Sequence, residues 1–170
     1  MGTLRRMAAV AVTALLLIGS SPAMADTTID AQTNAARATY GLPALGTGAG
    51  LTTVAATRVQ QITTNFSHPS SWQWLFDAIP GCESALGENI AWYTAGYEPA
   101  GWPVSAWMNS STHKANILNT AWTLQGSARL TTNGRTYAVQ LFSKPCTSTA
   151  PAPAPAPPIV DVLTDTSMSP

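Results

Sequence analysis

Two histidines and a few acids are the groups through which this chain could do chemistry. His68 and His113 are its only histidines, and Glu88 lies between them, 20 residues after the first and 25 before the second. Ser110 lies three residues before His113. Imidazole and carboxylate groups are ligands of zinc. The spacings match no short metal motif, so surface or capping histidines are the alternative.

A hydrolase can also be drawn from these residues. Ser110 would be the nucleophile, His113 the base and Glu88 the acid that orients the base. The sequence has no G-x-S-x-G elbow and no H-E-x-x-H helix to support that interpretation. Ser110 could instead cap the turn that follows a helix. The residues alone therefore leave catalysis, metal binding and a structural role open.

Apolar residues at helical spacing predict three helices. They cover residues 28–40, 51–64 and 103–109. His68 then falls in a loop after the second helix, and His113 falls past the end of the third. Loops held by a rigid scaffold are where sites tend to be built.

The C-terminal part of the domain changes to the alternating pattern of strands. Residues 124–131 and 135–143 flank Asn133-Gly134, a dipeptide that favours a tight hairpin turn, and are predicted to form antiparallel strands. Helices followed by a hairpin indicate an α+β domain.

The N-terminus indicates export. Residues 1–25 contain two arginines, an apolar run and the small residues Ala23-Met24-Ala25, which is the pattern of a secretory signal with its cleavage site. The mature protein is expected to begin at Asp26. The apolar run, about 13 residues long, is too short to cross a bilayer, so no transmembrane segment is expected.

Export bears on the cysteines and the C-terminus. Cys82 and Cys146 are the only cysteines, and in an oxidising compartment they are expected to form one disulfide. Residues 150–158 alternate Ala and Pro, which favours extended polyproline II. We therefore expect a folded domain over residues 26–149 and a disordered tail over residues 150–170.

Charge and composition exclude some partners. Eight basic residues balance eight acidic ones and only 9% of residues are charged, so the chain lacks the basic excess that nucleic acids or anionic membranes require. Hydrophobic residues make up 45%, with six tryptophans. These can form a packed core or line an apolar groove. We expect a monomer.

Six short motifs occur in a fixed order over residues 26–142. They are Asn34-x-x-Arg37-x-x-x-Gly41-Leu42-Pro43-Ala44-Leu45, Leu51-x-x-x-Ala55, His68, Gly87-Glu88-Asn89-Ile90-Ala91, Trp107-x-x-Ser110-x-x-His113-x-x-Asn116-Ile117-Leu118 and Tyr137-Ala138-Val139-Gln140-Leu141-Phe142. In this order they resemble the CAP superfamily of cysteine-rich secretory, antigen 5 and pathogenesis-related proteins. The similarity is greatest to its bacterial SCP-like extracellular branch.

The resemblance implies a three-layer α-β-α sandwich with a central antiparallel sheet. It also implies a cleft where two histidines and two glutamates can hold a divalent metal such as zinc. The first histidine falls on His68, the Glu of the G-E-N motif on Glu88, and the histidine of W-x-x-S-x-x-H on His113. The position of the second glutamate holds Ser110. His68, Glu88 and His113 are thus the expected metal ligands, with Ser110 beside them in the cleft.

Three functions follow as hypotheses. We expect a secreted, non-enzymatic module that binds a divalent metal, or a small apolar ligand such as a lipid or sterol, in its cleft. The alternatives are an extracellular hydrolase that uses the His/Glu cleft and an envelope-associated protein that meets an extracellular protein partner, with the tail as spacer.

Overall fold

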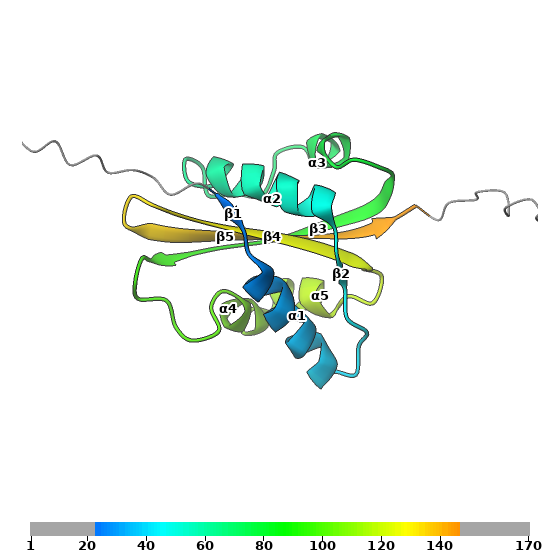
Figure 1. Cartoon of the computed structure of the whole chain (residues 1–170), viewed down its shortest axis with the longest axis horizontal. Coiled ribbons are helices and arrows are strands. Elements are labelled where there is room, and N and C mark those ends of the chain that lie inside the picture. The colour runs from blue at the N-terminus through cyan, green and yellow to red at the C-terminus, as the bar shows by residue number, and fades with distance from the viewer. Residues whose placement is uncertain (1–22, 147–170) are drawn as a thin grey trace, which may run out of the picture.

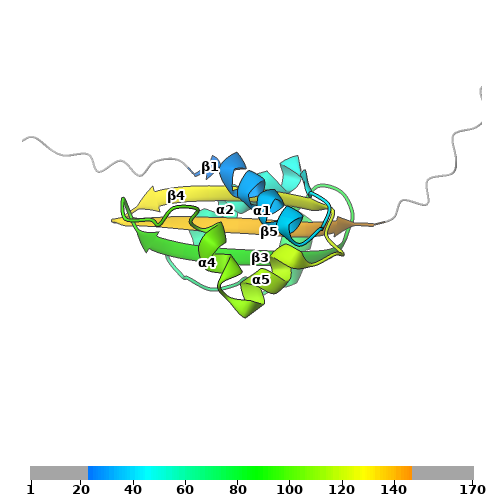
Figure 2. The same ribbon diagram turned by 90° about the horizontal axis from the view of Figure 1, so that it is seen from below.

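The computed structural model describes residues 23–146, which fold into three layers (Figure 1). Two helices cover one face of a central sheet: α2 (Ala49–Gln61) and α3 (Trp72–Ala78). Three cover the other, as the view from below shows (Figure 2): α1 (Thr27–Thr39), α4 (Val104–Met108) and α5 (Ser111–Leu118). This is the α-β-α sandwich that the resemblance implied.

Three long strands form most of the sheet. They are β3 (Glu83–Thr94), β4 (Leu124–Thr132) and β5 (Arg135–Pro145), and β1 (Met24–Ala25) and β2 (Gly46–Thr47) are two-residue additions. The order β1-β4-β5-β3 is antiparallel throughout, β3 lies at an edge, and only β2 pairs in parallel, beside β4. Asn133 and Gly134 join β4 to β5 with φ of 50° and 70°, so both have the positive φ that a two-residue hairpin turn favours.

The ends of the chain bear on the export predictions. Most of residues 1–25 and all of residues 150–170 lie outside the described residues. Met24 and Ala25 pair with β4, so cleavage before Asp26 would remove β1. Asp26 caps α1, because its carboxylate accepts the backbone N–H groups of Thr28 and Ile29. Residues 23–146 contain no helix long and apolar enough to span a membrane.

Besides the two-residue strands β1 and β2, three elements were not predicted from periodicity. They are α3, β3 and α5, which have 7, 12 and 8 residues. His113 was expected past a helix end but lies inside α5, and Glu88 lies in the middle of β3. The helices α3 and α5 each bury a single residue, Leu75 and Ile117, so neither shows an apolar repeat, and β3 carries polar residues in its buried centre.

Both faces of the sheet are buried, and β5 shows this most clearly. Tyr137, Val139 and Leu141 alternate toward the α2 layer, while Ala138 and Phe142 point toward the α1 layer.

The six tryptophans divide equally between the core and the surface. Trp102, Trp107 and Trp122 are buried, whereas Trp72, Trp74 and Trp92 are exposed.

The packing of α2 on the sheet depends on Gly126 of β4. A Cβ there would lie 2.7 Å from Leu51 Cβ and closer still to the backbone nitrogen of Thr52. The helix backbone therefore approaches the strand more closely than any side chain would permit. This contact sets the depth at which α2, and the side chains it carries, sit on the sheet.

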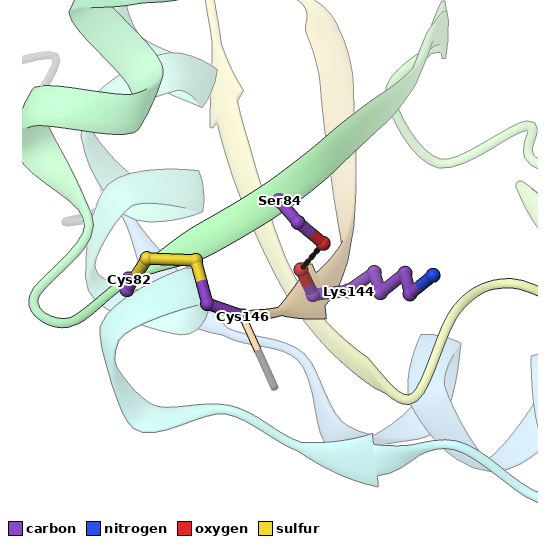
Figure 3. Close-up of a disulfide and its surroundings, with 4 residues drawn as sticks. All are labelled: Cys82, Ser84, Lys144 and Cys146. Carbon is purple, nitrogen blue, oxygen red and sulfur yellow. Dashed lines mark hydrogen bonds between the residues drawn. A yellow bond between two sulfur atoms is a disulfide. The ribbon is translucent and has the colours of Figure 1, made fainter. Parts of the chain in front are cut away.

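The disulfide between Cys82 and Cys146 joins the start of β3 to the end of β5 (Figure 3). Beside it the Cys146 N–H donates to the Cys82 carbonyl at 2.9 Å, and the Ser84 hydroxyl donates to the Lys144 carbonyl at 2.9 Å. The sequence predicted this bond. It closes a loop of 64 residues, worth about 4 kcal/mol in the chain-entropy model.

The replacement Gly126→Ala should destabilise the domain by about 2 kcal/mol or more, because the added methyl must push α2 off the sheet. Gly46→Ala is the matched control, since its Cβ would meet only the end of the Leu124 side chain, at 3.2 Å, and the Thr123 carbonyl at 3.8 Å. Urea unfolding measures both. Equal losses for the two variants would contradict the close contact described for α2.

Candidate functional site

A buried ion pair lies at the centre of the candidate site. Arg58 of α2 donates from Nε to Glu88 Oε1 at 2.8 Å and from Nη2 to Glu88 Oε2 at 3.4 Å. The Glu88 side chain is completely buried, and Arg58 is only 5% exposed. A buried carboxylate is costly unless it is paired and hydrogen-bonded, and Arg58 supplies both conditions.

Arg58 also holds the segment that leads to His68. Its Nη1 donates to Gln61 Oε1 at 2.8 Å, and its Nη2 donates to the Ser67 carbonyl at 3.0 Å. One guanidinium therefore connects the last turn of α2, the following loop and β3. This arrangement fixes the backbone immediately before His68.

His68 completes the cluster. Its Nδ1 lies 3.0 Å from Glu88 Oε2, while the side chain is 51% exposed. An ionised carboxylate only accepts hydrogen bonds, so Nδ1 carries the proton and donates it. Nε2 on the other side of the ring then remains free to act as an acceptor or a ligand.

His113 lies in the opposite helical layer. Its Nδ1 is 2.9 Å from the hydroxyl of Ser110, the N-cap residue of α5. Burial, and secondly the nearby charge of His68, lower the pKa of His113. His113 is therefore neutral at pH 7.

Two asparagines attach the His113 helix to the strand of Glu88. Asn116 Nδ2 donates to the Glu88 carbonyl at 3.1 Å and to Asn89 Oδ1 at 2.9 Å, and Asn89 Nδ2 donates to the His113 carbonyl at 3.2 Å. Glu88 and Asn89 are neighbours on β3 and so point to opposite faces. Because β3 is an edge strand, groups from the two helical layers can meet only around its free edge.

These contacts do not form the expected metal centre. Within residues 23–146, no three His, Cys, Asp or Glu side chains are grouped so as to hold a metal ion. Glu88 already accepts hydrogen bonds from Arg58 and His68 with both of its oxygens, and Ser110 brings no second carboxylate. The arrangement of His68, Glu88 and His113 therefore does not fit a metal.

A hydrolytic triad is not assembled either. Ser110 and His113 are in contact, as the hydrolase hypothesis requires. The acid of that hypothesis, Glu88, is bonded to His68 instead. The described hydrogen bonds thus leave His113 without an orienting carboxylate.

A pocket of about 390 Å³ lies between the C-terminal turn of α2 and the N-terminal turn of α3. Its walls are mostly uncharged hydrogen-bonding side chains together with one indole ring. The lining residues are Arg58, Gln61, Thr64, Asn65, Ser67, His68, Pro69, Ser70, Ser71 and Trp74.

Sequence reasoning named His68 but missed Arg58 and Trp74. Arg58 did leave a signal, because it lies seven residues after Leu51 on the apolar face of the predicted helix. A charged residue in such a position needs a buried partner. Trp74 left none, since α3 was not predicted.

Comparisons with known proteins agree with this architecture. The model of the CAP family, described as the cysteine-rich secretory protein family, matches residues 31–142. An outer surface protein of Borrelia burgdorferi is similar in structure, with a TM-score of 0.59, 22% identity and coverage of 70% of this chain and 91% of that one. A search of curated proteins found no significant match.

Two longer bacterial proteins share the fold. A cysteine-rich secretory protein of Staphylococcus aureus gives a TM-score of 0.58 at 18% identity over 69% of this chain, and an extracellular SCP-domain protein of Bacillus anthracis gives 0.56 at 26% over 69%. This chain covers only 37% and 39% of those two proteins.

Replacing Glu88 with Gln should cost about 3–5 kcal/mol of stability, because it leaves the buried Arg58 without its counter-charge. Asp77→Asn is the control: Asp77 is an exposed carboxylate on α3, and its loss should change stability by less than about 0.5 kcal/mol. Chemical denaturation measures both. A Glu88→Gln variant as stable as the native protein would rule out the buried ion pair.

His113 should titrate below its ordinary pKa of 6.5. The unfolded chain then takes up this proton at a higher pH than the folded one, so stability should fall as pH drops from about 6.5 through the folded pKa. His113→Gln should remove that slope, and His68→Gln should raise the pKa of His113. NMR titration of the ring protons measures the pKa, and a normal value would contradict the burial of His113.

Proposed function

Because the chain belongs to the cysteine-rich secretory protein (CAP) family, we propose that it is an exported binding module whose pocket beside His68 takes a small, uncharged, hydrogen-bonding ligand. Family membership and the disulfide support export. So do the extracellular and outer-surface descriptions of the Bacillus anthracis and Borrelia burgdorferi proteins.

The observation that supports this ligand class is the lining of the pocket. The charge of Arg58 is balanced by Glu88, so the walls offer no unpaired charge to an ion. Gln61 and Asn65 provide amides, and Thr64, Ser70 and Ser71 are among the hydroxyl groups. Amides and hydroxyls both donate and accept hydrogen bonds, which suits a ligand that does the same.

Neutral sugars have this chemistry. Their hydroxyl groups donate and accept, and the apolar face of a pyranose ring can lie against an indole such as Trp74. The pocket volume of about 390 Å³ is within the range of small-molecule sites. We therefore propose a mono- or disaccharide unit as the ligand.

The other ligands expected from the sequence receive less support. A lipid or sterol site is lined mainly by apolar residues, whereas Pro69 and Trp74 are the two apolar residues among the ten that line this pocket. A divalent metal would need Glu88 as a ligand, but both oxygens of Glu88 already accept hydrogen bonds from Arg58 and His68. A hydrolase would need an acid on His113, so we propose that the module acts by binding alone. Association with the cell envelope through the 150–170 tail remains a hypothesis.

The proposal predicts that neutral mono- and disaccharides, N-acetylated sugars included, bind the mature protein with micromolar to millimolar Kd. Trp74→Ala should weaken this binding by about tenfold or more, because it removes the aromatic wall. Trp92→Ala is the matched control: both tryptophans are exposed, at 36% and 40%, and Trp92 does not line the pocket. Ligand-observed NMR and tryptophan fluorescence measure the binding.

Two results would contradict the proposal. The first is extraction of a sterol or fatty acid by a protein that binds no saccharide in the panel. The second is saccharide binding that Trp74→Ala leaves unchanged, because the ligand would then lie elsewhere.

A further inference from the structure

We infer that Arg58 takes the place of a metal ion in this site and keeps the site from binding one. The chain resembles a metal-binding family, but in this site the positive charge belongs to an arginine side chain and not to a bound ion. The inference does not depend on the saccharide proposal, because its test measures zinc and not the pocket ligand.

The contacts of Arg58 are all to oxygen atoms that surround its charge. Its guanidinium donates to both oxygens of Glu88 and to two further oxygens, the side-chain carbonyl of Gln61 and the backbone carbonyl of Ser67. All four acceptors are oxygens gathered from a helix, a loop and a strand. An arginine can hold such a set permanently, because it remains charged at every physiological pH.

Charge balance excludes a second cation. The pair Arg58–Glu88 is neutral and nearly inaccessible to solvent, at 6% and 0% side-chain exposure. A divalent ion near it would meet the guanidinium at short range with little water to screen the repulsion. Ser110 provides no compensating carboxylate in the position where the resemblance placed a second acid.

The role of Glu88 changes accordingly. With Oε2 on His68 Nδ1, the carboxylate orients the imidazole instead of acting as a ligand itself. Outside the fixed pair, the nitrogens left for a metal are Nε2 of His68 and Nε2 of His113. Two neutral imidazoles are one ligand short of the three protein ligands found in catalytic zinc sites.

Zinc titration of the mature full-length protein by isothermal calorimetry tests the inference. The native protein should bind zinc weakly or not at all. Arg58→Gln removes the charge and leaves the Glu88 carboxylate without a cation, so zinc affinity should rise by about 100-fold. Arg58→Lys keeps the charge and should stay close to the native protein. Adding His68→Ala to Arg58→Gln should abolish the gain.

Weak zinc binding could result from the charge of Arg58 or from the lack of a carboxylate at position 110. The variant Ser110→Glu distinguishes these two explanations. If Arg58 excludes zinc, restoring the acid at position 110 should gain no more than about tenfold in zinc affinity while Arg58 is present. Strong zinc binding by Ser110→Glu would assign the effect to the missing acid and overturn the inference. Strong native zinc binding that His68→Ala removes would overturn it as well, whether or not Arg58→Gln folds.

If Arg58→Gln is unfolded without metal, circular dichroism with added zinc replaces calorimetry for that variant. Refolding by zinc supports the inference, because the ion then supplies the cation that the site lacks. A chain that zinc cannot refold, or a folded Arg58→Gln that binds zinc no better than the native protein, overturns it.

Discussion

The buried ion pair between Arg58 and Glu88 is the constraint on which the site depends. A carboxylate in the middle of a strand covered by helices needs a permanent partner, and the guanidinium of Arg58 on α2 provides a positive charge beside it at every physiological pH. The same guanidinium holds the Ser67 carbonyl, and the same carboxylate holds His68. The buried pair thereby holds the exposed imidazole of His68 in place. This ring and its contacts form a rigid polar wall at the edge of the pocket.

The fold brings this pair together by close packing on both faces of the sheet. On one face, Gly126 lets α2 approach the strands closely enough for Arg58 to reach β3. On the other, Asn116 ties α5 to the backbone of the same strand. The disulfide at Cys82 anchors the beginning of β3 to β5. The strand of Glu88 is therefore held by contacts to both helical layers. It is also held by its pairing with β5 and, at its beginning, by the disulfide.

The sequence predicts a helix or strand only where its apolar residues repeat regularly or a distinctive turn follows it. The first helix and the hairpin about Asn133-Gly134 were predicted, because both have long apolar repeats or a distinctive turn. The elements α3, β3 and α5 were not, because each of these two helices buries only one residue and the strand carries polar residues where a core strand would be apolar. The resemblance named His68, Glu88, Ser110 and His113. It could not show which partner Glu88 takes, since that depends on the depth at which α2 packs.

The central claim is that Glu88, charged and held by Arg58, fixes His68 with its Nδ1 proton directed inward. Long-range ¹H–¹⁵N NMR of the imidazole, recorded at about pH 8.5, two units above the ordinary pKa of free histidine, tests this claim directly. The account predicts that His68 is the Nδ1–H tautomer in the native protein and that Glu88→Ala returns it to the tautomer mixture of a free histidine. A native His68 that carries its proton on Nε2, or one whose tautomer does not respond to the loss of Glu88, would contradict the account.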